Sequence, residues 1–293
     1  MFNKEVLKSK LKELKLSLYL LNRNLLTRIS IVILILIVLI AIFAPFVAPY
    51  PEDAINATHP SEIFLAPSKE HLFGTDELGR DILSRVIYGT RISLSSSFIT
   101  VIVAMVVGTA LGAIAGAFGG VIDTVIMRIA DIFLSFPSML LAIVISSFLG
   151  PSLSNCQLAM IISWWPWYTR IMRGEAISIK ERQYIKAADT IGTNKFTTII
   201  KHIVPNGLSP IIIQGSMDLG SVVMTLASLS FLGLGAQAPT PEWGLMVSTS
   251  KSYFLNVWWY TLFPSLAIFI LVLVFNIIGD ALREVLDPKT RKI

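Results

Sequence analysis

Residues 29–48 read ISIVILILIVLIAIFAPFVA, an apolar run without a single charged side chain. A helix rises about 1.5 Å per residue, so this run is long enough to cross the roughly 30 Å hydrocarbon core of a bilayer. The runs are continuous rather than alternating, which favours helices over the strands of a membrane barrel. Five more apolar runs follow, at residues 93–117, 121–148, 158–168, 208–234 and 258–278. The sequence therefore predicts an all-α membrane protein with six transmembrane helices.

The composition supports this class. Of the 293 residues, 54% are hydrophobic and only 15% are charged, which is too apolar for an ordinary soluble domain. The net charge of +5 comes without a basic patch interleaved with aromatic residues, so it does not indicate nucleic-acid binding. The run at residues 158–168 is the shortest and crosses a bilayer only if its helix extends to about residues 155–173.

Charged residues between the runs predict the orientation of the chain. Residues 1–28, 174–206 and 283–293 carry an excess of lysine and arginine, whereas residues 49–91 are rich in acidic side chains. Loops rich in lysine and arginine stay in the cytoplasm, so both termini and the 174–206 loop are predicted to be cytoplasmic and the 49–91 segment extracytoplasmic. The charged lead and the first apolar run are both longer than those of a signal peptide, which predicts an uncleaved anchor.

The loop at residues 174–206 is patterned as a structural element of its own. Its segment YIKAADTIG, residues 184–192, has four apolar side chains on one face of a short helix. These residues are Tyr184, Ala187, Ala188 and Ile191. Gly192 is suited to end this helix, because only glycine adopts a left-handed conformation at little cost.

A second apolar stripe follows Gly192 and predicts a second short helix. It consists of Phe196, Ile199, Ile200 and Ile203. Pro205 then marks the end of this helix or its passage into the next span. A helix–glycine–helix with apolar faces is either an amphipathic hairpin lying on lipid or a docking site for a partner protein. The spacing alone leaves both interpretations open.

Small and charged residues inside the spans predict contacts between helices. Glycines recur every four residues at Gly108, Gly112 and Gly116, which allows close approach of a neighbouring helix, either of this chain or of a second subunit. Arg128 and Asp131 are three residues apart and are predicted to form an ion pair or contact a partner.

Gln214 and Asp218 lie four residues apart in the fifth run, with Met217 between them. An acidic residue near the middle of a membrane is a functional candidate. These three residues are predicted either to line a transport pathway or, for Asp218, to form a hydrogen bond between helices.

Several kinds of chemistry are not predicted for this chain. It has no G-x-x-x-x-G-K-[ST] phosphate-binding loop, so we do not expect it to bind ATP in that manner. His59, His71 and His202 are scattered along the chain and predict no metal triad or catalytic acid–base site. Cys156 is the only cysteine, which excludes an intrachain disulfide. No bound cofactor is therefore predicted.

Motifs along most of the chain point to a known family. The outer segment HLFGTDELGRDILSR, residues 71–85, resembles the H-P-x-G-T-D-x-x-G-R-D-x-x-S-R signature of ABC-importer permeases of the dipeptide/oligopeptide/nickel branch. The loop KAADTIG, residues 186–192, resembles the E-A-A-x(3)-G loop of ABC-importer permeases, with Ile203 and Pro205 in the expected positions. Residues 23–50 are similar to the N-terminal span of the C-type subunit. The match is completed by SFLGLG at 230–235, PEWG at 241–244 and N-x-x-G-D-x-L-R-x-x-L-D-P at 276–288.

The resemblance implies a type I importer fold and one of two permease subunits in a heterodimer of the bacterial or archaeal plasma membrane. Two cytoplasmic ATPase subunits would hold ATP and magnesium, and an extracytoplasmic binding protein would deliver the substrate. The residues implied to couple this chain to the ATPases are Tyr184, Ala187, Ala188, Asp189, Gly192, Phe196, Ile203 and Pro205. The implied organisation is a tail at 1–28, a first span at 29–48, an outer segment at 49–91, a core of five spans at 92–282 and a tail at 283–293.

Three positions depart from the family pattern. Lys186 replaces the usual glutamate of the loop, Leu72 replaces the proline after His71, and Leu226 replaces a glutamate in the fifth run. Any ion pair made by those glutamates is therefore not expected here. Peptides are the expected cargo, with nickel or a nickel chelate as the alternative. An ion-coupled secondary transporter is a further alternative, although the sequence shows no inverted repeat.

Overall fold

The computed structural model describes residues 24–286, apart from the side chain of Asp189. Most of the predicted tails at 1–28 and 283–293 lies outside these residues. The described residues contain helices and one isolated β-bridge, and no strand. The helices are α2 (Leu25–Ile42), α3 (Ala44–Val47), α4 (Ile82–Phe118), α5 (Gly120–Leu134), α6 (Ser138–Leu149), α7 (Leu153–Lys180), α8 (Gln183–Thr190), α9 (Lys195–Thr198), α10 (Val204–Phe231), α11 (Trp243–Ser250) and α12 (Trp258–Leu286).

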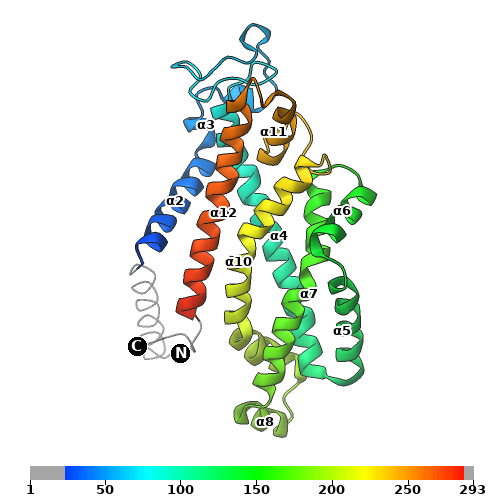
Figure 1. Cartoon of the computed structure of the whole chain (residues 1–293). Helices are drawn as coiled ribbons and strands as arrows, with labels where there is room; N and C mark the ends of the chain where they lie inside the picture. The colour runs from blue at the N-terminus through cyan, green and yellow to red at the C-terminus, as the bar shows by residue number, and fades with distance from the viewer. Residues whose placement is uncertain (1–23, 287–293) are drawn as a thin grey trace.

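The long helices stand side by side, with residues 49–81 at one end of the bundle and α8 at the other (Figure 1). Within the described residues, four helical segments are long and apolar enough to cross a membrane: α2, α4, residues 195–231 and α12. Helices α5 and α6 make a fifth such segment if they are taken together, but they meet at an angle of 88°. Pro137 lies at this break, where its missing N–H and its ring prevent one continuous helix.

The predicted short span at residues 158–168 lies within α7, which is 28 residues long. Such a helix is about 42 Å long, enough to cross a bilayer. It carries Arg170, Arg173 and Lys180 in its second half, and these make it less apolar than the other spans. These charges are tolerated because α7 packs among α4, α5, α6 and α10.

The tightest helix pair joins α4 to α7. A methyl group built on Gly108 would lie 2.5 Å from the Tyr168 Cβ atom, and one on Gly116 would lie 2.5 Å from the Ala176 Cβ atom. Residue numbers increase in the same direction on both sides of this contact, from Gly108 to Gly116 in α4 and from Tyr168 to Ala176 in α7. The two helices therefore run parallel. The neighbour of this glycine face is therefore a helix of the same chain, and it approaches too closely to leave space for side chains.

Helix α10 lies in the middle of the bundle and contacts α4, α7 and α12. Gly220 of α10 faces Asn276 of α12, where a Cβ atom would lie 2.7 Å from the asparagine Oδ1. Helix α2 lies at the edge and packs on α12 and α4. It exposes a row of apolar side chains, which suits contact with lipid. These are Ile29, Val32, Ile35, Leu36 and Leu39.

Candidate functional site

The segment that joins α7 to α10, residues 181–203, forms one end of the bundle (Figure 1). We call it the α8 segment. Helix α8 ends at Thr190, and Gly192 follows with a φ of +80°, the left-handed conformation that favours glycine. The Thr193 N–H donates to the Ala188 carbonyl at 3.0 Å, as in a Schellman motif. A Cβ atom on Gly192 would meet nothing within 4 Å, so the backbone conformation alone calls for glycine.

The second half of the α8 segment differs from the predicted independent helix. The Asn194 side chain caps the four-residue helix α9 through the Phe196 N–H at 3.0 Å. A π-helical turn, Ile199–Ile203, then leads directly into α10, and Pro205 lies in the first turn of α10. The wider π-helical turn changes which residues share a face. The expectation that Phe196, Ile199, Ile200 and Ile203 form one stripe is therefore wrong.

The apolar residues of the α8 segment point two ways. Ile185, Ile199 and Ile203 are buried in the main core of the bundle. Phe196 also contacts the bundle. Its ring packs edge-to-face with that of Phe118 of α4, and the two ring centroids are 5.5 Å apart. The other side is exposed and includes Ala187, while Ala188 is half-buried. The large exposed apolar side chains are Tyr184 (44%), Phe196 (59%), Ile200 (69%) and Ile191 (83%). Such a patch on a rigidly held segment suits an interaction with another surface.

Lys186, the departure from the family glutamate, forms an ion pair within the α8 segment. Its ammonium lies 2.7 Å from a Glu181 carboxylate oxygen, and both side chains are well exposed. The positive charge of Lys186 lowers the pKa of the Glu181 carboxyl group below its ordinary value. The charge of Lys186 is thus partly balanced within this chain.

The predicted pair between Arg128 and Asp131 is wrong. Asp131 accepts instead from Arg170 of α7 at 2.6 Å, and Asp123 of α5 accepts from Arg173 at 2.6 Å. Arg128 is exposed and has no acidic partner among the described residues. The reason is geometric: α7 lies beside α5, and its arginines reach the two aspartates across the helix interface.

Asp218 lies inside the helix bundle. It is 9% exposed, and each carboxylate oxygen accepts a hydrogen bond, one from the Tyr168 hydroxyl at 2.6 Å and one from the Gln214 amide at 2.9 Å. The backbone of Met217 packs against Gly279 of α12. Of the two roles proposed for Asp218, this geometry supplies the hydrogen bond between helices, while pathway lining remains a prediction.

A groove of about 580 Å³ opens on another side of α10, between α11 and α12. Its lining is mostly apolar and includes Met224, Phe231, Val247 and Phe269. None of the predicted pathway residues Gln214, Met217 and Asp218 is among those that line it.

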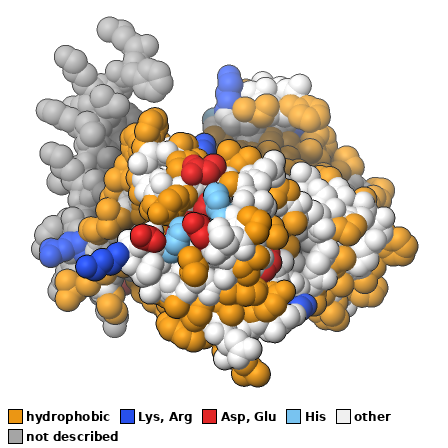
Figure 2. Space-filling model, turned by 90° about the horizontal axis from the view of Figure 1, so that it is seen from above, with side chains coloured by type: hydrophobic (Ala, Val, Ile, Leu, Met, Phe, Trp, Pro, Cys, Tyr) orange, Lys and Arg blue, Asp and Glu red, His pale blue; other side chains and the backbone are white. Residues whose placement is uncertain are grey.

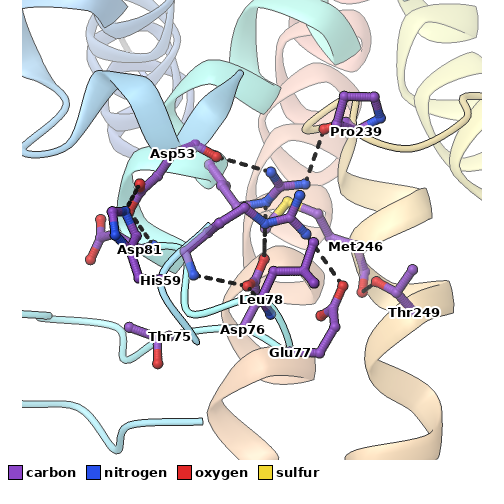
Figure 3. Close-up of polar contacts among 12 residues, drawn as sticks. Asp53, His59, Thr75, Asp76, Glu77, Leu78, Asp81, Pro239, Met246 and Thr249 are labelled. Carbon is purple, nitrogen blue, oxygen red and sulfur yellow. Dashed lines mark hydrogen bonds and ion pairs between the residues drawn. The ribbon is translucent and has the colours of Figure 1, made fainter. Parts of the chain in front are cut away.

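At the end opposite α8, the GTD motif folds into a network of buried charges (Figure 3). We call this network the GTD clasp; it consists of Asp53, Asp76, Arg80, Asp81 and Arg85. Asp76 is fully buried, and its Oδ1 accepts from the backbone N–H groups of Leu78 and Arg80. Its Oδ2 accepts from Arg80 Nε at 2.7 Å. Gly79 has a φ of +76°, and its Cα packs so tightly on His59 that a side chain has no space.

The GTD clasp ties the outer segment to the bundle. Asp81 caps α4 by accepting from the Ser84 N–H at 2.7 Å, and its own N–H donates to Asp53 at 2.7 Å. Arg85 of α4 donates to the carbonyl oxygens of Asp53 at 3.1 Å and Pro239 at 3.4 Å. His59 lies 2.8 Å from Asp53, and this hydrogen bond raises the pKa of the imidazole.

The sequence contains a signal for this clasp, namely five charged residues within positions 76–85 and a glycine at position 79. The motif alone does not predict which carboxylate meets which guanidinium. Seen from above, acidic and histidine side chains gather near the centre of this end, surrounded by hydrophobic ones (Figure 2). No group of three metal-ligating side chains among the described residues is arranged to hold a metal ion.

The fold and the two ends define a class of helical membrane protein, with an exposed apolar segment at one end and a network of buried charges at the other. The chain belongs to the family of binding-protein-dependent transport system inner membrane components, whose family model matches residues 108–292. Residues 15–67 match the N-terminal transmembrane domain of oligopeptide transport permease C. The resemblance to ABC-importer permeases, inferred from the motifs, is confirmed. In this family the chain is a membrane permease subunit and not itself an enzyme.

Several relatives match almost the whole chain. A dipeptide transport system permease protein of Alkalihalophilus pseudofirmus is 46% identical over 92% of this chain and 88% of its own length. A probable D,D-dipeptide transport system permease protein of Escherichia coli is 43% identical over 92% and 90%. A glutathione transport system permease protein of Pectobacterium atrosepticum is 42% identical over 86% and 83%.

A solved structure of the MetNI methionine ABC transporter, in inward-facing conformations, matches the fold. The TM-score is 0.55 over 70% of this chain and 96% of that chain, at 18% sequence identity. This match supports the predicted importer-permease fold.

Proposed function

We propose that this chain is one permease subunit of an ATP-driven importer of dipeptides or short oligopeptides. It pairs with a second permease subunit, two cytoplasmic ATPase subunits that hold ATP and magnesium, and an extracytoplasmic binding protein. The relatives described above are named for dipeptides, D,D-dipeptides and glutathione, which favours a peptide cargo over nickel.

The observation that carries the coupling role is the two-sided α8 segment. Its inner side, Ile185, Ile199 and Ile203, is buried in the bundle, so a displacement of the segment acts on the adjoining ends of α7 and α10. Its outer side exposes Tyr184, Ile191 and Ile200, which are available to enter a groove on an ATPase subunit. Movement of the ATPases thus reaches the spans as a rigid-body displacement of packed helices.

Two substitutions test the coupling role. Gly192→Val forces a β-branched residue into a left-handed conformation, at a cost of about 1–2 kcal/mol, and Ala188→Asp places a charge near the docking side. We expect both variants to insert and to pair with the second permease subunit, but to lose at least about tenfold in uptake and in substrate-stimulated ATP hydrolysis by the complex in lipid. Thr197→Ala, at a half-buried position of the same segment, is the control.

Co-purification and energy source separate this function from an ion-coupled transporter. Cytoplasmic ATPases should co-purify with the tagged chain, and peptide uptake should stop when ATP is depleted. Uptake that survives ATP depletion but stops when the proton gradient collapses would instead assign the chain to the secondary transporters. Wild-type coupling in both Gly192→Val and Ala188→Asp would reduce the α8 segment to a hairpin at the lipid surface.

A further inference from the structure

The two helices that flank the α8 segment, α7 and α10, contact each other again inside the bundle. Helix α7 precedes the α8 segment and α10 follows it. Any contact between these two helices therefore closes a loop of chain that contains the segment. From Lys180 back to Tyr168 is twelve residues, and from Val204 forward to Asp218 is fourteen. These lengths correspond to about 18 Å and about 21 Å of helix. The Tyr168–Asp218 hydrogen bond therefore joins α7 and α10 at nearly equal distances from the α8 segment.

The position of Tyr168 is tightly fixed. Its side chain is fully buried. Gly108 of α4 lies against its Cβ atom, and a Cβ atom built on Gly215 of α10 would lie 3.9 Å from its hydroxyl oxygen. Gly108 of α4 thus leaves space for the tyrosine, and the tyrosine hydroxyl reaches Asp218 at 2.6 Å. Gln214 occupies the other carboxylate oxygen at 2.9 Å, which orients the carboxylate toward Tyr168.

Helix α7 is held to its other neighbours by several polar contacts. Arg170 and Arg173 pair with aspartates of α5, and the Lys180 ammonium donates to the Ala117 carbonyl at the end of α4 at 3.0 Å. By contrast, the Tyr168–Asp218 bond is the only side-chain hydrogen bond between α7 and α10 within residues 24–286 as described. Below it, the two helices touch through apolar contacts such as Met172 on Gly207.

We propose that Tyr168 and Asp218 are positioning residues that lock α7 and α10 into one lever, so that a displacement of the α8 segment reaches both helices together. This inference rests on the proposed coupling role of that segment. Without the bond, α7 stays with α4 and α5, while α10 slides or tilts against α7 at the apolar contact between Gly207 and Met172. ATP hydrolysis then continues, but less of it produces transport.

The test uses the complete importer in lipid vesicles, with ATP hydrolysis and dipeptide uptake measured on the same sample. Tyr168→Phe removes only the hydroxyl, and Asp218→Leu removes both accepting oxygens at a similar side-chain size. We expect hydrolysis to stay within about twofold of wild type and uptake per ATP to fall about tenfold in Tyr168→Phe. The double variant should fall no further, because both changes remove the same bond. Ser163→Ala is the matched control, since its buried hydroxyl on α7 donates only within its own helix.

A distance measurement separates this inference from the coupling role as a whole. Spin labels at Ile177 of α7 and Leu208 of α10, introduced in a Cys156→Ser background, lie at exposed positions. We expect a narrow distance distribution in the otherwise unchanged chain, with and without nucleotide, and a broader one in Tyr168→Phe. The proposal would be overturned if Tyr168→Phe showed the same distance distribution as the otherwise unchanged chain, or if it retained wild-type uptake per ATP. Failure of Tyr168→Phe to assemble would also overturn it, because the bond would then serve folding. If the wild-type complex itself shows no ATP-driven uptake, the proposed function fails instead.

Discussion

At the scale of single residues, Asp76 is the charge on which the GTD clasp depends. It is fully buried, 2.7 Å from Arg80 Nε and 3.5 Å from Arg85 Nε, and both arginines are also buried. Asp76→Ala removes the carboxylate that two buried guanidinium groups share and leaves Arg80 only its longer contact with Glu77 at 3.3 Å. Breaking a buried ion pair in this way costs about 3–5 kcal/mol. We expect little folded protein in the membrane, measured by detergent extraction and size-exclusion chromatography. Glu70→Ala, an exposed acid of the same segment, should behave as wild type; equal yields of the two variants would contradict the role of the clasp.

His59 gives the GTD clasp a dependence on pH. Its hydrogen bond to Asp53 raises its folded-state pKa above the ordinary 6.5. The stabilisation is therefore complete below about pH 6.5 and is lost as the pH rises through the folded-state pKa. The imidazole is about one-third exposed, so solvent screens the pair and we take its contribution as about 1 kcal/mol. We therefore expect a fall in Tm of about 3 °C between pH 6 and pH 8.5. His59→Asn should lose this part of the pH dependence and His202→Asn should retain it; an unchanged pH profile in His59→Asn would exclude the pair as its source.

At the scale of elements, the α4–α7 pair is the contact least able to accept a larger side chain. A Cβ atom on Gly112 would lie 2.4 Å from the Thr169 carbonyl oxygen, which belongs to the rigid backbone of α7. Gly112→Leu therefore forces the helices apart, and overpacking of this kind typically costs about 1–3 kcal/mol or more. We expect reduced membrane levels and poor assembly, measured by quantitative immunoblotting and pull-down of the second subunit. Gly174→Leu, at a position of α7 where a Cβ atom meets nothing within 4 Å, is the control. Normal levels of Gly112→Leu would mean that this interface yields easily.

Elements differ in how far the sequence predicts them. The apolar runs and the turn at Gly192 follow from local patterns, because run length and a left-handed glycine are properties of short segments. The Arg128–Asp131 pair was predicted from the helical period, which describes a single helix. The actual partners of Asp131 and Asp123 lie 39 and 50 residues away on α7, and such contacts depend on how the helices pack. The π-helical turn at Ile199–Ile203 likewise has no sequence pattern of its own, so the faces of the second stripe were predicted wrongly.

At the scale of the whole molecule, the α8 segment and the GTD clasp occupy opposite ends of one bundle (Figure 1). One end presents exposed apolar side chains on an element continuous with two central helices. The other end is fixed by buried charges that join the outer segment to the start of α4 and to the loop before α11. In the proposed importer, the α8 end would transmit ATPase movement to the helices, and the opposite end would offer a firm surface to the binding protein. The positive-inside rule predicts that the α8 end lies in the cytoplasm, which is the side on which the proposed ATPase subunits would bind.

This orientation is tested by labelling single cysteines in intact cells, in a Cys156→Ser background. Arg182 and Lys195 lie in the α8 segment, while Glu62 and Leu255 lie toward the opposite end. The side chains of Arg182, Lys195 and Leu255 are exposed, and that of Glu62 is 43% exposed. We expect a membrane-impermeant maleimide added outside to label Glu62→Cys and Leu255→Cys only. Permeabilised cells should then label Arg182→Cys and Lys195→Cys as well. Glu242 is a poor choice for the outer position, because it is the buried N-cap of α11 and a label there would report packing rather than the side of the membrane. Labelling of Lys195→Cys in intact cells would reverse the orientation and, with it, the side on which the ATPases must bind.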